Sequence, residues 1–491
     1  MVNQSRALTD RLLRLHNLNR IDLFNSINNL STLSVVDPKK DSTTITQHLV
    51  QAGLTYIESE DGLLDTVLTV VKGPARVGGM MVANTVTFDG LYPGPTLVMR
   101  RGDRIRILLR NELEDSEANI HFHGFHVTPE GSGDNMRIRV PPGGAFQYDF
   151  VIPANQDEGL FWLHGHVFGL SDHHVSLGLS SLLVVDGGAA DLLRDKRRVL
   201  MAINEMQISD DGRAVYPPTT PTWEHTYTIN GEIMPVFMIR PGETQFWQLA
   251  NIGANTYLRL QVEAHDFTVL EVDGGLLYNT YRADDLFLYQ ARRMGVAITA
   301  SNTAGDYTIR TLGWDGGVFN NYTATDLAIL RVEGPTVPDQ TPPAIPAHPR
   351  RPNDARFVPS DQVAAYRTFI LSENGPTAPV PEFYINSMLF SDRTPEWTPQ
   401  AVVDTTEEWL IAVSNSPTQL QDPHVWHVHT NPFAIVGQGE WDYREGVRSL
   451  EQVAPNGTQD VINIEPGTYV VLRTHLADFP GRPVMHCHLL L

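Results

Sequence analysis

Nine of the 18 histidines in this 491-residue chain fall into four short clusters. The clusters read HFHG at 121–124, LHGH at 163–166, HVWHVH at 424–429 and MHCH at 485–488. An isolated histidine is usually a surface residue or a hydrogen-bonded core residue. Four clusters are different, because burying many imidazoles without partners is costly and a shared metal centre would satisfy them.

The spacing inside each cluster predicts which side chains share a face. Residues two apart on a β-strand point to the same side, so each cluster offers one matched pair of imidazoles. The pairs are His121 with His123, His164 with His166, His427 with His429, and His486 with His488. Eight imidazoles arranged in this way are enough for a site that holds several metal ions.

Cys487 and His424 are the two remaining candidate ligands, and each is predicted to lie on the face of its strand opposite to the paired histidines. Cys487, the only cysteine, lies between two histidines, and His424 lies three residues before His427. The same alternation predicts that Cys487 and His424 meet at a second site, and a His2Cys set with a weak axial ligand is typical of blue-copper electron-transfer centres. Structural zinc is the weaker alternative, because a closed four-ligand site does not require eight histidines in two distant parts of the chain.

Three segments with one pattern predict the elements that position these residues. They read GDRIRILLRN (102–111), GETQFWQLAN (242–251) and TEEWLIAVSN (406–415), and each ends on Asn. Their alternating apolar residues are typical of half-buried strands. A weak repeat at intervals of roughly 150 residues predicts three copies of one β domain.

Shifts in composition suggest where the domains begin and end. Short strands between Gly- and Pro-rich turns favour an all-β fold of β-sandwich or barrel domains. A proline-rich segment cannot pair in a sheet and predicts an extended linker. We expect a polar N-terminal extension with a short amphipathic helix (1–60), a first domain (61–186), a second domain (187–334), the linker (335–356) and a third domain (357–491).

The overall charge and the single cysteine exclude several classes of protein. A net charge of −21 argues against a nucleic-acid partner, because phosphates would be repelled. One cysteine excludes an intrachain disulfide framework. No window approaches the length of an apolar membrane span, and the N-terminus lacks the apolar core of an export signal. Localisation and oligomeric state stay open.

The ordered motifs resemble those of the multicopper oxidases, laccase-like enzymes of three cupredoxin domains. The family pattern is HxHG, HxH, HxxHxH and HCH followed by another His, and the resemblance covers roughly residues 61–491. It implies three consecutive Greek-key cupredoxin-like domains with a trinuclear copper cluster between the first and the third. The middle domain would hold no copper, so its isolated His225 and His265 are expected to be structural.

The resemblance also implies about four coppers in a complete chain: one type 1, one type 2 and two type 3. Matched position by position, the type 2 ligands are His121 and His427, and the type 1 ligands are Cys487 and His424. The type 3 ligands are His123, His164, His166, His429, His486 and His488. The implied reaction is four one-electron oxidations of a small reducing donor, phenolic or aromatic by default, coupled to reduction of dioxygen to water.

Asp134, in GSGDNMRIRVPPGG, matches an acid that the family keeps near the cluster. We expect it to orient water or relay protons. The alternative is a residue that caps a turn in a Gly/Ser loop. For the whole protein, the rival hypothesis is a non-catalytic copper-binding or coat-type structural protein on the same fold, with a degenerate type 1 site.

The chain departs from the family pattern in several places. Val425 and Thr430 stand where the family commonly has Pro and Gly, and the chain ends at Leu491, one residue before the second type 1 histidine would come. We expect the sequence to be a piece of a longer product, with a degenerate member as the alternative. Three further histidines match no motif position and are expected in loops or behind the ligands: His126, His173 and His174.

Overall fold

The computed structural model describes residues 53–220, 224–316, 321–338, 359–375, 382–389 and 399–489. Most of the expected N-terminal extension and of the linker therefore lies outside the described residues. Strands dominate the described chain, and the two α-helices within it are short: α2 (Ser171–Ser176) and α3 (Ala189–Leu192). No helix among these residues is long and apolar enough to cross a membrane.

The first domain consists of two sheets around an apolar core. One sheet has the order β3 (Met80–Phe88), β2 (Leu63–Val77), β5 (Arg104–Asn111), β7 (Ala145–Val151). The other has the order β1 (Tyr56–Glu58), β4 (Thr96–Met99), β9 (Ser180–Val185), β8 (Gly159–His164), β6 (His121–His123). Because β1 pairs with β4, this sheet begins before residue 61.

The middle domain repeats the two-sheet plan around its own core. One sheet has the order β11 (Thr226–Ile229), β10 (Arg197–Met206), β13 (Thr244–Asn251), β18 (Arg293–Thr299), β15 (Phe267–Val272), β16 (Gly275–Ala283). The other has the order β12 (Val236–Ile239), β22 (Thr325–Val332), β19 (Gly305–Leu312), β14 (Leu258–Val262), β17 (Leu286–Leu288), and β20 (Trp314–Asp315) pairs separately with β21 (Asn321–Tyr322).

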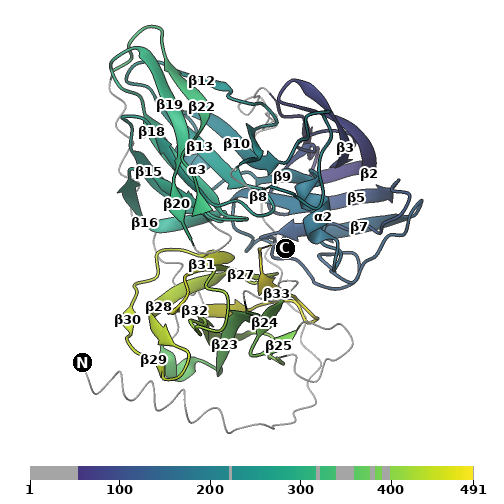
Figure 1. The fold of residues 1–491 in the computed structure, drawn as a ribbon, viewed down its shortest axis with the longest axis vertical. Helices are drawn as coiled ribbons and strands as arrows, with labels where there is room; N and C mark the ends of the chain where they lie inside the picture. The colour runs from purple at the N-terminus through teal and green to yellow at the C-terminus, as the bar shows by residue number, and fades with distance from the viewer. Residues whose placement is uncertain are drawn as a thin grey trace.

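The third domain places a large sheet behind a small one. The large sheet contains β25 (Met388–Leu389), β24 (Phe383–Ile385), β23 (Ala365–Glu373), β26 (Thr405–Val413), β32 (Thr468–Leu476), β28 (Phe433–Asp442), β29 (Gly446–Val447) and β30 (Glu451–Gln452). The small sheet has the order β31 (Val461–Ile464), β27 (His424–Val428), β33 (Met485–Cys487). In Figure 1 this small sheet faces the other two domains, with β8 above it.

The three segments with the shared pattern occupy one position in the three domains. β5, β13 and β26 each pair in parallel with one neighbour and antiparallel with the other. Each carries alternating side chains into a domain core. β5 is half-buried as predicted, but β13 and β26 are buried along almost their whole length, because their second faces pack into further apolar clusters. The predicted all-β fold of three repeated domains is confirmed.

The Asn that ends each of the first two repeats holds the loop that follows its strand. The Nδ2 of Asn251 donates to the carbonyls of Thr256 (2.7 Å) and Leu288 (2.9 Å), and its Oδ1 accepts from Gly253 N–H. Asn111 makes the same kind of contacts in the first domain. Asn415 is half-buried and holds a different segment, because it donates to the Trp441 carbonyl and accepts from Tyr443 N–H at the end of β28. Asparagine can do this because its amide both donates and accepts.

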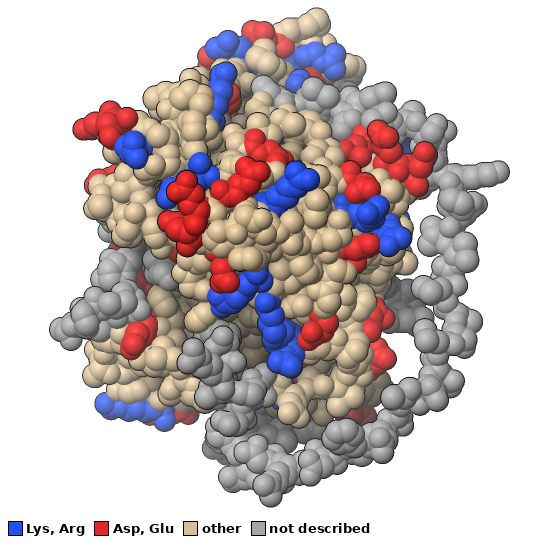
Figure 2. All heavy atoms as spheres, turned by 90° about the vertical axis from the view of Figure 1, so that its right-hand side faces the viewer, with Lys and Arg blue, Asp and Glu red and all other residues tan. Residues whose placement is uncertain are grey.

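Charged side chains of both signs share the surface of the described chain. Figure 2 shows basic side chains placed beside acidic ones on one face, rather than joined into a continuous basic surface. Exposed ion pairs also form on the described chain, such as Arg104 with Asp149 and Arg331 with Asp306.

We predict that Asn251→Ala lowers the free energy of unfolding by about 2–4 kcal/mol, because two buried carbonyls lose their donor. Chemical denaturation followed by fluorescence measures the change. Asn415→Ala is the matched control, since its site is half-buried and water can replace the amide. Equal losses in the two variants would contradict this account.

Candidate metal centre

Two pairs of antiparallel strands place the histidine clusters face to face. In the first domain β6 pairs with β8, which sets His121 opposite His164. In the third domain β27 pairs with β33, which sets His427 opposite His486. Only His121 and His123 lie together on one strand, as the spacing predicted. His166, His429 and His488 instead lie just beyond the ends of β8, β27 and β33, where the chain still brings them to the cluster.

Imidazoles from the first and third domains converge on one another. The Nε2 atoms of His121 and His427 lie 3.3 Å apart, and those of His166 and His486 lie 3.1 Å apart. Within the third domain the Nε2 atoms of His429 and His486 are separated by 3.2 Å. In three sets of three histidines, one ring nitrogen from each residue lies within 4.8 Å of the other two: His121, His123 and His164; His121, His427 and His429; and His166, His429 and His486.

Several ring nitrogens in this cluster are buried without a hydrogen-bond partner. Within the described part of the chain these include Nδ1 of His123, Nε2 of His164 and both nitrogens of His488. Buried polar atoms are almost always paired, so such a concentration indicates a ligand that binds nitrogen lone pairs. Burial, reinforced by neighbouring imidazoles, lowers the pKa of His164 and of His486 to about 3. The rings are therefore neutral, the form that binds copper.

In several of the ligand candidates the ring nitrogen that points away from the cluster is held by a hydrogen bond. Nδ1 of His121 lies 2.9 Å from both carboxylate oxygens of Asp134, and Nδ1 of His427 lies 2.8 Å from the carbonyl oxygen of Asp460. Nδ1 of His486 lies 2.8 Å from the Cys487 carbonyl oxygen. A ring anchored through Nδ1 presents Nε2 to the cluster, which is how protein metal sites orient histidine.

Asp134 does not behave as a simple turn cap. It is 1% exposed, and besides His121 it accepts the backbone N–H of Phe122 at 2.8 Å. Its Oδ2 also lies 3.4 Å from Nδ1 of His429. The carboxylate is thus directed at two candidate ligands rather than at its own Gly/Ser loop.

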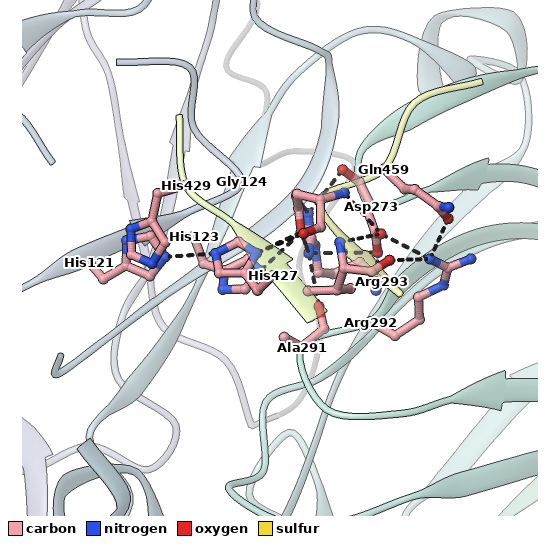
Figure 3. A network of polar contacts seen from close by, with 12 residues as sticks. His121, His123, Gly124, Asp273, Ala291, Arg292, Arg293, His427, His429 and Gln459 are labelled. Carbon is pink, nitrogen blue, oxygen red and sulfur yellow. Dashed lines mark hydrogen bonds and ion pairs between the residues drawn. The ribbon is translucent and has the colours of Figure 1, made fainter. Parts of the chain in front are cut away.

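A buried ion-pair network, which the sequence did not reveal, holds the ring of His123 in place (Figure 3). His123 Nε2 lies 3.0 Å from Oδ1 of Asp460, which leaves Nδ1 as its free nitrogen. Arg293, on β18 of the middle domain, donates to the same Oδ1 at 2.8 Å and to the carbonyl oxygen of Asp273 at 2.9 Å. Burial raises the pKa of Asp460, and Arg293 opposes that shift. The one feature of the sequence that could have indicated this network is the pair of adjacent arginines, Arg292 and Arg293, at the start of an apolar strand.

The glycine of the first cluster is explained by this network. Gly124 has φ +85°, and a Cβ there would lie 2.6 Å from Asp460 Oδ2 and 2.7 Å from Arg293 Nη2. Any side chain would push the ion pair away from His123. The G of HFHG is therefore required by a contact between domains.

The structure brings Cys487 and His424 together on the other face of the small sheet. Cys487 pairs in register with Trp426 on β27, two residues from His424. Burial lowers the pKa of His424, but Cys487 and Glu373 more than offset it and raise the value to about 10. Nε2 of His424 lies 3.0 Å from Oε1 of Glu373. Both residues thus lie where the alternation predicted.

The histidines outside the motifs have structural positions. His126 is buried and joins the first and third domains, with Nδ1 2.7 Å from the Thr430 carbonyl oxygen and Nε2 2.9 Å from Asp478. His173 and His174 lie on helix α2, so the expectation of a loop is wrong for them. In the middle domain His225 and His265 contact backbone carbonyl oxygens of Thr220 and Glu263.

We predict that Arg293→Met destabilises the protein by about 3–5 kcal/mol, because Asp460 would remain buried without its cation. Chemical denaturation measures this loss, and copper analysis should show fewer ions held by the cluster. Arg282→Met is the control, since Arg282 pairs with Asp266 on the surface of the same domain. Its effect should stay within about 0.5 kcal/mol. If Arg293→Met bound as much copper as the wild type, the ion pair would not be needed for metal binding by the histidine cluster.

Thr430 adopts a conformation that suits the glycine commonly found in the family. Its φ is +67°, which is strained for a β-branched residue, and its buried hydroxyl has no partner among the described residues. We predict that Thr430→Gly raises the free energy of unfolding by about 1–2 kcal/mol. Thermal unfolding measures the change, with Thr430→Ala as the control that removes the hydroxyl and keeps the strain. If Thr430→Gly were less stable than the wild type, the backbone at position 430 would not be strained by threonine.

Known proteins resemble this chain in sequence, and solved structures resemble it in fold. Bilirubin oxidase of Albifimbria verrucaria is 26% identical over 427 residues, which are 83% of this chain and 71% of that protein. Laccase-2 of Trametes villosa is 25% identical over 480 residues, 86% of each chain. A solved structure titled as a multicopper oxidase from Campylobacter jejuni, a metallo-oxidase, has a TM-score of 0.72 at 21% identity, covering 90% of this chain and 92% of that one.

Models of the multicopper oxidase family match three successive parts of the chain. The matched residues are 69–189, 202–335 and 363–491. They cover most of the chain and include both regions that carry the histidine clusters, and the free ring nitrogens of those clusters suit copper. The chain therefore belongs to the multicopper oxidases, and it is a copper-dependent oxidoreductase.

Proposed function

We propose that this protein is a laccase-like oxidase, which couples four one-electron oxidations of a small reducing donor to the reduction of dioxygen to water. One observation carries the proposal. Eight imidazoles converge between two domains, while Cys487 lies between two of them in sequence and beside His424 on the opposite face. This arrangement suits one site that accepts electrons and another that uses them.

Copper bound at these residues supplies one-electron redox chemistry, and four ions together store the four electrons that dioxygen needs. Cys487 and His424 would hold type 1 copper, and His121 and His427 would hold type 2. The type 3 pair would be held by His123, His164, His166, His429, His486 and His488. Cys487 is bonded through the backbone to His486 and His488, so the two sites are only a few covalent bonds apart.

We assign Asp134 two tasks in this reaction. Its contact with Nδ1 of His121 fixes the tautomer that directs Nε2 at the cluster. Its position near His429 also allows the carboxylate to take up or return a proton beside the place where dioxygen would be reduced. Among the described residues, the carboxylate accepts hydrogen bonds from His121 and Phe122 and from none in its own Gly/Ser loop. This supports a role at the metal centre over the role of a turn cap.

A cleft between the middle and third domains supports an aromatic donor. It has a volume of about 500 Å3, and its walls include Tyr281, Phe287, Tyr289 and Met294 with Ile462 and Glu465. Its third-domain wall is β31, which pairs with the strand that carries His424. The cleft is also lined by Asp285 and Arg292, and aromatic walls with such polar groups suit a flat phenol or aromatic amine. Among the relatives, bilirubin oxidase is named for an organic donor, whereas the similar structure from Campylobacter jejuni is titled a metallo-oxidase.

We predict that Cys487→Ser abolishes the intense visible thiolate-to-copper band and donor-dependent oxygen uptake, while about three of four coppers remain. The reason is that serine removes the thiolate of the electron-accepting site and leaves the histidine cluster intact. Copper analysis, absorption spectra and an oxygen electrode with a phenolic donor measure the three effects on the full-length, copper-loaded chain.

His265→Gln, in the middle domain away from the clusters, is the control and should keep both the band and oxygen uptake. A wild-type chain that binds copper but shows neither the band nor oxygen uptake would instead support a non-catalytic copper-binding protein on the same fold. Cluster-bound copper with the band but no oxygen uptake would overturn the proposed dioxygen chemistry.

A further inference from the structure

Glu373 is a buried acid whose partner is a histidine. It ends β23, and in the neighbouring strand β26 two other buried acids pair with arginines: Glu407 with Arg367 and Glu408 with Arg473. Glu373 instead contacts His424, with side chains 3% and 2% exposed. A buried carboxylate is costly unless its charge is compensated, so this contact needs an explanation.

The contact decides which nitrogen of His424 is available. The contact is an ion pair and not an aligned hydrogen bond, because Oε1 of Glu373 has no hydrogen-bond partner in the described part of the chain. A carboxylate 3.0 Å away repels a lone pair on Nε2 and so favours the tautomer that carries the proton there. Nδ1 has no hydrogen-bond partner among the described residues and is then the ligand atom. Phe383, opposite Glu373 on β24, packs edge-on against the ring at a centroid distance of 6.1 Å.

We propose that Glu373 is a positioning residue of the type 1 site, which holds His424 with Nδ1 toward Cys487 and lowers the reduction potential of copper bound there. The inference rests on the proposed function. A carboxylate behind a ligating imidazole makes the ring a stronger donor and places negative charge near the metal. Both effects favour Cu(II) over Cu(I). Glu373 thereby restricts the enzyme to donors that are easily oxidised.

The test compares Glu373→Gln with Glu408→Gln in the full-length, copper-loaded chain. Glutamine keeps the size of the side chain and a carbonyl oxygen that can face Nε2, so Glu373→Gln should keep the visible thiolate-to-copper band. Its reduction potential, titrated through that band, should rise by the equivalent of a tenfold or greater change in the Cu(II)-to-Cu(I) affinity ratio, about 59 mV for one electron. Donors of high potential should gain in relative kcat/KM. Glu408→Gln, which removes a buried acid of the same domain from Arg473, should leave the potential unchanged.

A second variant separates position from charge. Glu373→Ala removes both, so the band should weaken or shift as His424 loses its orientation. If Glu373→Gln does not fold, Glu373→Asp keeps the charge but withdraws it from Nε2, and its potential should lie above that of the wild type.

An unchanged potential in a folded Glu373→Gln would overturn the inference, and so would an equal rise in Glu408→Gln. A wild-type chain without the band is a different failure, because it removes the proposed type 1 site itself.

Discussion

The ion pair between Arg293 and Asp460 is the interaction on which the metal centre depends. The candidate ligands of the cluster come from the first and third domains, yet the arginine comes from the middle one, which supplies none of them. Asp460 receives Arg293 on one side and contacts His123 on the other. A buried pair of this kind is expensive to desolvate, so its value lies in fixing the geometry of three domains more than in stability.

Local periodicity explains why so much of the site could be predicted from the sequence. In any β-strand, side chains two residues apart point to the same face. The pairs His121 with His123 and His427 with His429 could therefore be predicted to lie on one side before the fold was known. The position of Cys487 between two histidines likewise predicted its opposite face. The three repeated segments predicted the domains in a similar way, since a shared pattern of alternating apolar residues marks the equivalent strand of each domain.

The supporting residues could not be predicted, because nothing local marks them. Arg293 and Asp460 are 167 residues apart, and His123 and Asp460 are 337 residues apart. Each is one charged residue in an ordinary strand or loop, and Glu373 looks like any acid at the end of a strand. Their roles follow from tertiary neighbours alone. Thr430 is different, because its departure from the glycine of the family pattern was visible in the sequence, although its positive φ could be seen only in the structure.

The placement of buried carboxylates follows from the charge that the two sites must hold. Neutral imidazoles bring no negative charge, so cations bound among them need compensation from elsewhere. Asp134 and Asp460 contact histidines of the cluster. At the second site the negative charge comes from Glu373, which contacts His424, and from the thiolate of Cys487. Asp460 is partly neutralised by Arg293, whereas Glu373 faces no arginine among its described contacts. The cluster is thereby held by a shared ion pair, while the electron-accepting site keeps an acid whose full charge can act on the metal.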